Sequence, residues 1–205
     1  MMHKPSLREI KKEATAHALA EAAFELARER GLDGFVVEDV VQRAGYSRRT
    51  FANHFACKEE AVAVSAISFV AFDDAEHVLD ELPEESTPLD VLQQLLQTQF
   101  TAALLRKLHE LVLLAERYPT LEPYILNVFR SLQRAALETL EALFAERYPP
   151  GYCHMIVGAI YGAVMPVVEG LVEVPLPGRT IAYAADAPTF EQYLDAAFGY
   201  LKRGF

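Results

Sequence analysis

Apolar residues recur along this chain at intervals of three and four positions, whereas the strict alternation typical of β-strands is nearly absent. Within residues 7–30, for example, Leu19, Ala22, Ala23 and Leu26 share one face of a helix. The same spacing predicts further helices over residues 37–44, just after Ser47, and over about 58–82, 88–105, 106–117, 120–147, 151–173 and 188–203. The predicted fold class is therefore all-α.

Glycine and proline divide these helices into two groups. Gly45 stops the second helix, and the segment PEESTP at residues 83–88 is the clearest linker in the chain. We expect a three-helix domain at residues 1–57, a larger helical body at residues 58–205, and a connecting helix at residues 58–82.

Residues 37–55 have the layout of a helix-turn-helix, in which the second helix enters the major groove of DNA by its N-terminal end. Phe51 and Phe55 stand four positions apart and would anchor the short second helix to its neighbours. Arg48 and Arg49 would project from the opposite side, where an arginine fork can bind guanine O6 and N7 together. The residues expected to contact DNA are Ser47, Arg48, Arg49, Thr50, Asn53, His54 and Lys58.

A simpler interpretation is that Arg48 and Arg49 are solvated charges on an exposed turn, as isolated arginine pairs usually are. Here a glycine-containing turn, an aromatic anchor and a basic tip coincide, and this combination favours DNA recognition. Charge alone does not decide the matter. Residues 1–65 contain ten basic and ten acidic side chains, and residues 66–205 contain nine basic and nineteen acidic ones, so the net charge of −10 lies in the body.

The remaining composition argues against several classes of protein. No apolar run is long enough to span a membrane, and no secretory signal precedes the first helix, so a cytoplasmic protein is expected. The two cysteines, Cys57 and Cys153, are far apart and form no CxxC motif, and the histidines are scattered, so neither a disulfide scaffold nor a metal site is expected. No phosphate-binding loop or nucleophile elbow occurs, so we expect no cofactor and no enzyme activity.

Residues 19–62 resemble the DNA-binding domain of the TetR family of bacterial transcriptional regulators. The segment LAEAAFELARERG is similar to the family's first helix, VVEDVVQRAG to its second, and YSRRTFANHFACKEEAV to its third and the start of its fourth. The chain departs from the family pattern at Val36, Tyr46 and Ala52, where the family usually has Thr, a small aliphatic residue and an aromatic residue. The resemblance implies a homodimeric repressor that binds a double-stranded DNA operator and carries a small-molecule effector in its body.

The body is rich in aromatic and aliphatic residues that either fill a core or line an effector pocket, as the resemblance implies. Each one taken singly is more typical of a core. The residues expected at a pocket for a largely hydrophobic effector are Phe69, Phe72, Phe100, Leu104, Leu108, His109, Tyr124, Phe129, Tyr161 and Met165.

Two of the later helices carry residues suited to close helix contact. Residues 151–173 contain small side chains that let another helix approach, and residues 188–203 contain an apolar stripe. Both stretches are also compatible with a closed core within one chain, whereas the resemblance implies a four-helix interface around a two-fold axis. The expected interface residues are Ala159, Gly162, Ala163, Phe190, Leu194, Ala197, Phe198 and Leu201.

Two functional hypotheses follow. The first is a ligand-responsive repressor, in which an effector wedged against helix 58–82 changes the separation of the two DNA-reading heads. The second is a small-molecule binding protein of the same fold with weakened or lost DNA binding.

Overall fold

The computed structural model describes residues 6–66, 82–83, 85–144, 146–175 and 187–203. All regular secondary structure in these residues is helical, which confirms the all-α prediction. The chain forms two compact units, one of residues 1–68 and 113–128, the other of residues 69–112 and 129–205. The first unit thus extends beyond the predicted boundary at residue 57. Among the described helices, none is long and apolar enough to cross a membrane.

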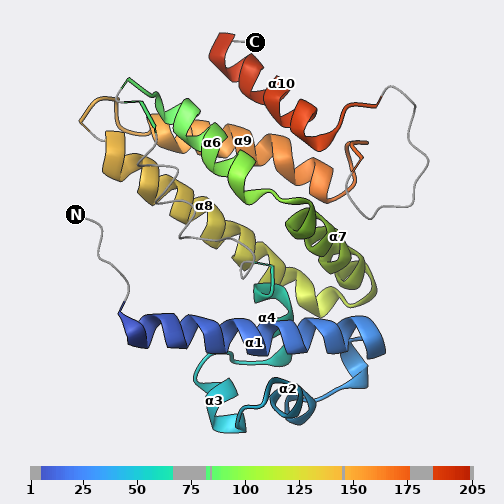
Figure 1. Ribbon diagram of the computed structural model, residues 1–205. Helices are drawn as coiled ribbons and strands as arrows, with labels where there is room; N and C mark the ends of the chain where they lie inside the picture. The colour runs from blue at the N-terminus through green and yellow to red at the C-terminus, as the bar shows by residue number, and fades with distance from the viewer. Residues whose placement is uncertain (1–5, 67–81, 84, 145, 176–186, 204–205) are drawn as a thin grey trace. The chain divides into compact units, whose positions relative to one another are not determined.

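The N-terminal unit is built on one long helix (Figure 1). Its elements are α1 (Leu7–Arg30), η1 (Leu32–Gly34), α2 (Val37–Ala44), α3 (Arg48–Ala52) and α4 (Lys58–Val64). Ser6 begins α1 with a capping box, since the Glu9 amide donates to Ser6 Oγ and the Ser6 amide donates to the Glu9 carboxylate. In Figure 1, α2 and α3 lie on the same side of α1.

The apolar face of α1 forms the core of this unit. Leu19, Ala23 and Leu26 are buried as predicted, and α4 and α2 pack against this helix. The Arg43 guanidinium of α2 donates to both carboxylate oxygens of Glu29 on α1, at 2.9 and 2.6 Å. This bidentate pair lies at the surface, so the apolar contacts contribute most of the stability of the α1–α2 packing.

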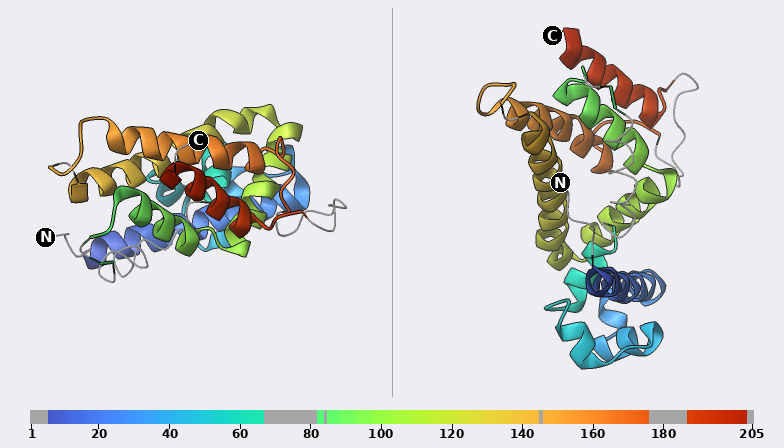
Figure 2. Two further views of the ribbon diagram at one scale, coloured as in Figure 1. Left: turned by 90° about the horizontal axis from the view of Figure 1, so that it is seen from above. Right: turned by 60° about the vertical axis from the view of Figure 1, so that its left-hand side comes forward.

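The remaining helices are α6 (Pro88–Gln99), α7 (Ala102–Arg117), η3 (Pro119–Leu121), α8 (Glu122–Phe144), α9 (Tyr152–Val168) and α10 (Phe190–Arg203). The short η3 lies in the N-terminal unit, and α6, α9 and α10 lie in the second unit. Helices α7 and α8 each begin or end in the N-terminal unit, because residues 113–128 belong to it. Helices α6, α9 and α10 pack on one another, as the two views of Figure 2 show.

Hydrogen bonds hold α10 to α6. Lys202 Nζ lies 2.8 Å from Asp90 Oδ1 and donates to Gln93 Oε1, and the Gln93 and Gln97 amides donate to Asp195. The Lys202 ammonium and the Thr87 cap lower the pKa of Asp90 to about 2. Because the folded pKa is depressed, the carboxylate's contribution to stability is present above its ordinary pKa and is lost as the pH falls toward 2.

Several predicted boundaries differ from the structure. The break expected between residues 105 and 106 lies instead at Phe100 and Thr101, where the Phe100 backbone leaves the helical region. Helix α9 ends at Val168 rather than residue 173, shortly after the internal Pro166. Of the predicted helix 58–82 the structure shows α4, which is followed by a turn at Ser65 and Ala66, and residues 67–81 lie outside the described residues.

Candidate DNA-binding surface and ligand cavity

The turn of the helix-turn-helix is set by local backbone chemistry. Gly45 ends α2 with φ of 75°, a left-handed conformation that favours glycine, and the Tyr46 amide donates to the Val41 carbonyl at 2.9 Å. Ser47 then begins α3, because its hydroxyl accepts from the Thr50 amide at 3.0 Å. Ser47 is therefore the N-cap of α3, and its hydroxyl also lies 2.8 Å from the Thr50 hydroxyl.

Two phenylalanines fix the orientation of α3. The side chains of Phe51 and Phe55 are 3% and 5% exposed, and their ring centroids are 5.5 Å apart. With this face buried, Arg48, Arg49 and Asn53 are exposed at the other side of the short helix. Helix α3 thus has the two faces expected of a helix that reads DNA, one buried and aromatic, the other exposed and basic.

The two arginines differ in their surroundings. Arg48 Nη1 lies 2.7 Å from Glu38 Oε1 of α2, and both side chains are mostly exposed. Within the described part of the chain, Arg49 forms no ion pair. Arg48 must give up its pair with Glu38 before it binds a base edge, whereas Arg49 is directly available.

His54 is partly buried beneath this surface, against Phe55. Burial, together with the nearby Lys12 ammonium of α1, lowers the pKa of His54. The imidazole is therefore neutral near neutral pH in the free protein.

We expect phosphate contact to raise the His54 pKa, because an approaching anion favours the protonated ring. DNA affinity should then increase from about pH 7 to about pH 5.5 by more in the wild type than in His54→Gln. Fluorescence anisotropy at constant salt measures both proteins. The folded pKa of His54 is depressed, so its own contribution to stability is lost as pH falls, and thermal unfolding at each pH serves as the control. Parallel pH profiles for the two proteins would contradict a phosphate contact.

Lys58 is used differently from the sequence prediction. Its ammonium donates to the Leu32 carbonyl at 2.7 Å and the Phe35 carbonyl at 2.8 Å, and it lies 4.9 Å from the Phe35 ring centroid. These contacts join the start of α4 to the turn between α1 and α2. Because two of the three ammonium donors already have partners, Lys58 acts as a structural clamp, and its geometry does not favour a phosphate contact.

The start of α2 compensates for the absence of a capping side chain at Val36. The Val36 amide donates to the Asp39 carboxylate at 2.9 Å, while the Val36 side chain is 55% exposed and forms no cap. Cys57 caps α4 instead of a hydroxyl residue, since its Sγ accepts from the Glu60 amide at 3.4 Å. Cys57 is therefore the N-cap of α4.

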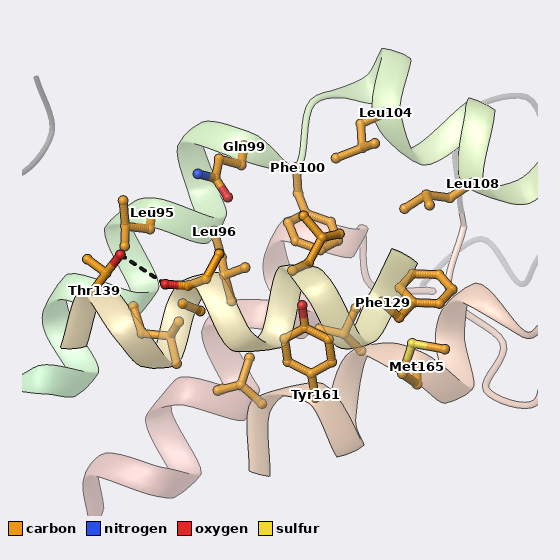
Figure 3. A pocket seen from close by; sticks show the side chains of 16 residues that line it. Leu95, Leu96, Gln99, Phe100, Leu104, Leu108, Phe129, Thr139, Tyr161 and Met165 are labelled. Atoms are coloured by element: carbon orange, nitrogen blue, oxygen red, sulfur yellow. Dashed lines mark hydrogen bonds between the residues drawn. The ribbon is translucent and has the colours of Figure 1, made fainter. Parts of the chain in front are cut away.

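An apolar cavity of about 90 Å³ lies within the second unit. Helices α6, α7, α8 and α9 contribute its walls, and the side chains converge on it in Figure 3. The lining consists of Leu92, Leu95, Leu96, Gln99, Phe100, Leu104, Leu108, Phe129, Leu132, Ala135, Ala136, Thr139, Ile160, Tyr161, Val164 and Met165.

The structure brings together six of the residues predicted for an effector pocket. They are Phe100, Leu104, Leu108, Phe129, Tyr161 and Met165. His109 lies on α7 but outside the lining, and Phe69 and Phe72 fall outside the described residues. Tyr124 lies in the N-terminal unit and is not among the lining residues, and the hydrogen bond between its hydroxyl and the Cys57 thiol raises the pKa of Tyr124.

Sequence reasoning missed the contribution of α6. Leu92, Leu95, Leu96 and Gln99 follow the three-and-four spacing that marks one helical face, and this spacing was a usable signal. A group of three or more histidine, cysteine or acidic side chains able to hold a metal does not occur among the described residues.

Three residues of the predicted dimer interface are buried within a single chain. Phe190, Leu194 and Phe198 are 5%, 2% and 1% exposed within a single chain, so they form its own core. Phe190 stacks on Phe100 with ring centroids 5.6 Å apart. The α9 residues Ala159, Gly162 and Ala163 retain exposure, as do Ala197 and Leu201 of α10.

Comparison with known proteins agrees with this geometry. Residues 19–63 match the family model of bacterial regulatory proteins, tetR family. No curated protein matches the chain. A solved structure from Mesorhizobium loti MAFF303099, whose description names the tetR family of transcriptional regulators, is 18% identical to it. The match has a TM-score of 0.54 and covers 94% of this chain and 97% of that one, and at this identity it establishes the fold. Residues 19–63 of this chain are therefore similar to the helix-turn-helix domain of the tetR family of bacterial regulatory proteins, and the whole chain shares the fold of that solved structure.

Proposed function

We propose that this protein is a ligand-responsive transcriptional regulator, a repressor released from its operator by a small, largely hydrophobic effector. The observation that carries the proposal has two parts. Arg48 and Arg49 are exposed at the start of α3, whose opposite face is buried through Phe51 and Phe55, and the second unit contains an apolar cavity. The α3 tip presents Arg49 for base recognition, and the neighbouring polar groups of Thr50, Asn53 and His54 suit phosphate or base-edge contacts.

Two helices connect the cavity to the DNA-binding unit through the chain itself. Helix α7 supplies Leu104 and Leu108 to the cavity and continues past residue 112 into the N-terminal unit. Helix α8 starts in that unit and then supplies Phe129. A ligand that favours one position of α7 and α8 would bias the DNA-binding unit, provided that it binds the two states with different affinity.

A small-molecule binding protein with weakened DNA binding is the second candidate. It is favoured by the ion pair of Arg48 with Glu38 and by the neutral charge of residues 1–65. Both features reduce the electrostatic attraction of phosphates, which supplies much of the affinity of most DNA-binding proteins.

Anisotropy with DNA from the protein's own promoter region, beside random DNA of equal length, separates the two candidates. The measurement is made at ~100 mM salt and repeated at lower salt, because affinities depend steeply on ionic strength. If the protein is a repressor, its affinity for the promoter fragment should be at least about tenfold higher than its affinity for random DNA. Equal affinity for both fragments, or no binding at low salt, would favour the second candidate.

We further propose a homodimer that uses the exposed face of α9. Met155, Gly158, Ala159 and Gly162 are all exposed on this face, and open space surrounds a Cβ added at Gly158 or Gly162. Small residues let two helices approach closely, and a dimer would place two reading heads on successive major grooves, roughly 34–36 Å apart.

Substituting Gly158→Arg should convert the dimer to a monomer without unfolding the chain. The arginine side chain enters open space in a single chain but would obstruct a helix packed on α9. Sedimentation velocity at micromolar concentration gives the assembly state, and circular dichroism verifies the helical content. Gln94→Arg, on the exposed side of α6, is the matched control and should leave the dimer intact. A monomeric wild type would exclude this interface.

A further inference from the structure

None of the described residues that line the cavity carries a charge that could compensate an ion. Among its sixteen described lining residues, thirteen are apolar and the others are Gln99, Thr139 and Tyr161. A carboxylate or ammonium group buried there would lose its hydration without gaining an opposite charge. The lining therefore favours an uncharged ligand.

The three polar residues of the lining are not equivalent. Thr139 Oγ1 donates to the Ala135 carbonyl at 3.0 Å, so its hydrogen is already used within α8. The Tyr161 hydroxyl has no hydrogen-bond partner among the described residues, and neither has the Gln99 amide. Both side chains are half-exposed, so their polar groups are free to bond to a ligand, and such a bond adds to the affinity of the ligand.

The position of Tyr161 makes it the principal polar anchor. Figure 3 shows its ring along the cavity with the hydroxyl directed toward the Phe100 side chain, while Gln99 stands at the edge beside Leu95. Burial raises the pKa of Tyr161, so its hydroxyl stays protonated at all physiological pH values and is available as a donor. Gln99 can both donate and accept.

We infer that the ligand of this cavity is an uncharged molecule with a compact apolar body, such as a single ring, and one hydroxyl or carbonyl group that the Tyr161 hydroxyl binds. This inference rests on the proposed function only in calling the ligand an effector. The cavity of about 90 Å³ is of the order of the ~150 Å³ apolar cavity that accepts benzene in an engineered protein, so single-ring probes are suitable.

Three probes of matched size test the ligand class. Phenol carries one hydroxyl, benzene carries no polar group, and benzoate carries a charge near neutral pH. Ligand-observed NMR titration gives the affinity of each probe for the full chain. We expect phenol to bind about three- to tenfold more tightly than benzene, which is the range of one neutral hydrogen bond. Benzoate should bind at least tenfold more weakly than phenol.

The variant Tyr161→Phe identifies the anchor. It should bind benzene as the wild type does and lose the preference for phenol, whereas Tyr200→Phe, at an exposed tyrosine of α10, should retain that preference. Equal binding of phenol and benzene, tighter binding of benzoate, or an unchanged preference in Tyr161→Phe would overturn the inference, as would failure of both neutral probes to bind. If phenol binds with the expected preference but does not release DNA, the inference stands and the proposed effector response fails.

Discussion

Arg49→Ala should weaken binding to the promoter fragment by ~1–3 kcal/mol, roughly five- to 150-fold, while random DNA is affected much less. Arg49 is exposed at the tip of α3 and forms no ion pair within the described part of the chain, so its fork is available for a guanine edge. Anisotropy titrations with both DNA fragments at one salt concentration measure the effect.

Arg48→Ala should cost less than Arg49→Ala, because Arg48 gives up its 2.7 Å pair with Glu38 when it binds DNA. Removing the competing partner in Glu38→Gln should accordingly strengthen binding. Arg130→Ala, an exposed arginine of α8 in the second unit, is the matched control and should change neither affinity. Equal losses on promoter and random DNA would mean that Arg49 touches only phosphates.

Phe51→Ala should destabilise the N-terminal unit by about 3–5 kcal/mol, the range for removing a buried phenylalanine side chain. Phe51 is 3% exposed and packs against Phe55, so the substitution leaves a cavity under α3 and releases the arginine tip. Chemical denaturation measures the free energy of unfolding. We expect the variant to lose DNA binding as well as stability.

Val36→Ala is the matched control for this stability measurement. Its side chain is apolar but 55% exposed, and the Asp39 carboxylate caps α2 through the backbone of residue 36, so the loss should stay below ~0.5 kcal/mol. A similar small loss for Phe51→Ala would contradict the anchoring role assigned to the aromatic pair.

The helices of the N-terminal unit were predictable because their limits are local. Gly45 adopts the left-handed conformation that ends α2, Ser47 caps α3, and the spacing of Leu19, Ala23 and Leu26 matches the buried face of α1. Each of these features depends on a few adjacent residues, so the sequence contains all the information needed to place them.

The partners of a side chain were less predictable. Periodicity shows that Phe190, Leu194 and Phe198 share an apolar face but not whether the chain itself or a second copy covers it. The sequence suggests that Lys58 is a free cation, yet its ammonium donates to two carbonyl groups that are more than twenty residues away along the chain. Tyr124 likewise bonds to Cys57 through the fold rather than through sequence proximity.

The central claim is that occupation of the cavity controls DNA binding, and operator release measures it most directly. The protein bound to its promoter fragment is titrated with neutral single-ring compounds, phenol among them, that raise its Tm. In parallel, Ala136→Phe places a ring in the cavity and should abolish the response to these compounds. We expect these compounds to release DNA from the wild type and to leave the DNA affinity of the variant unchanged. Compounds that stabilise the wild type without changing its DNA affinity would contradict it.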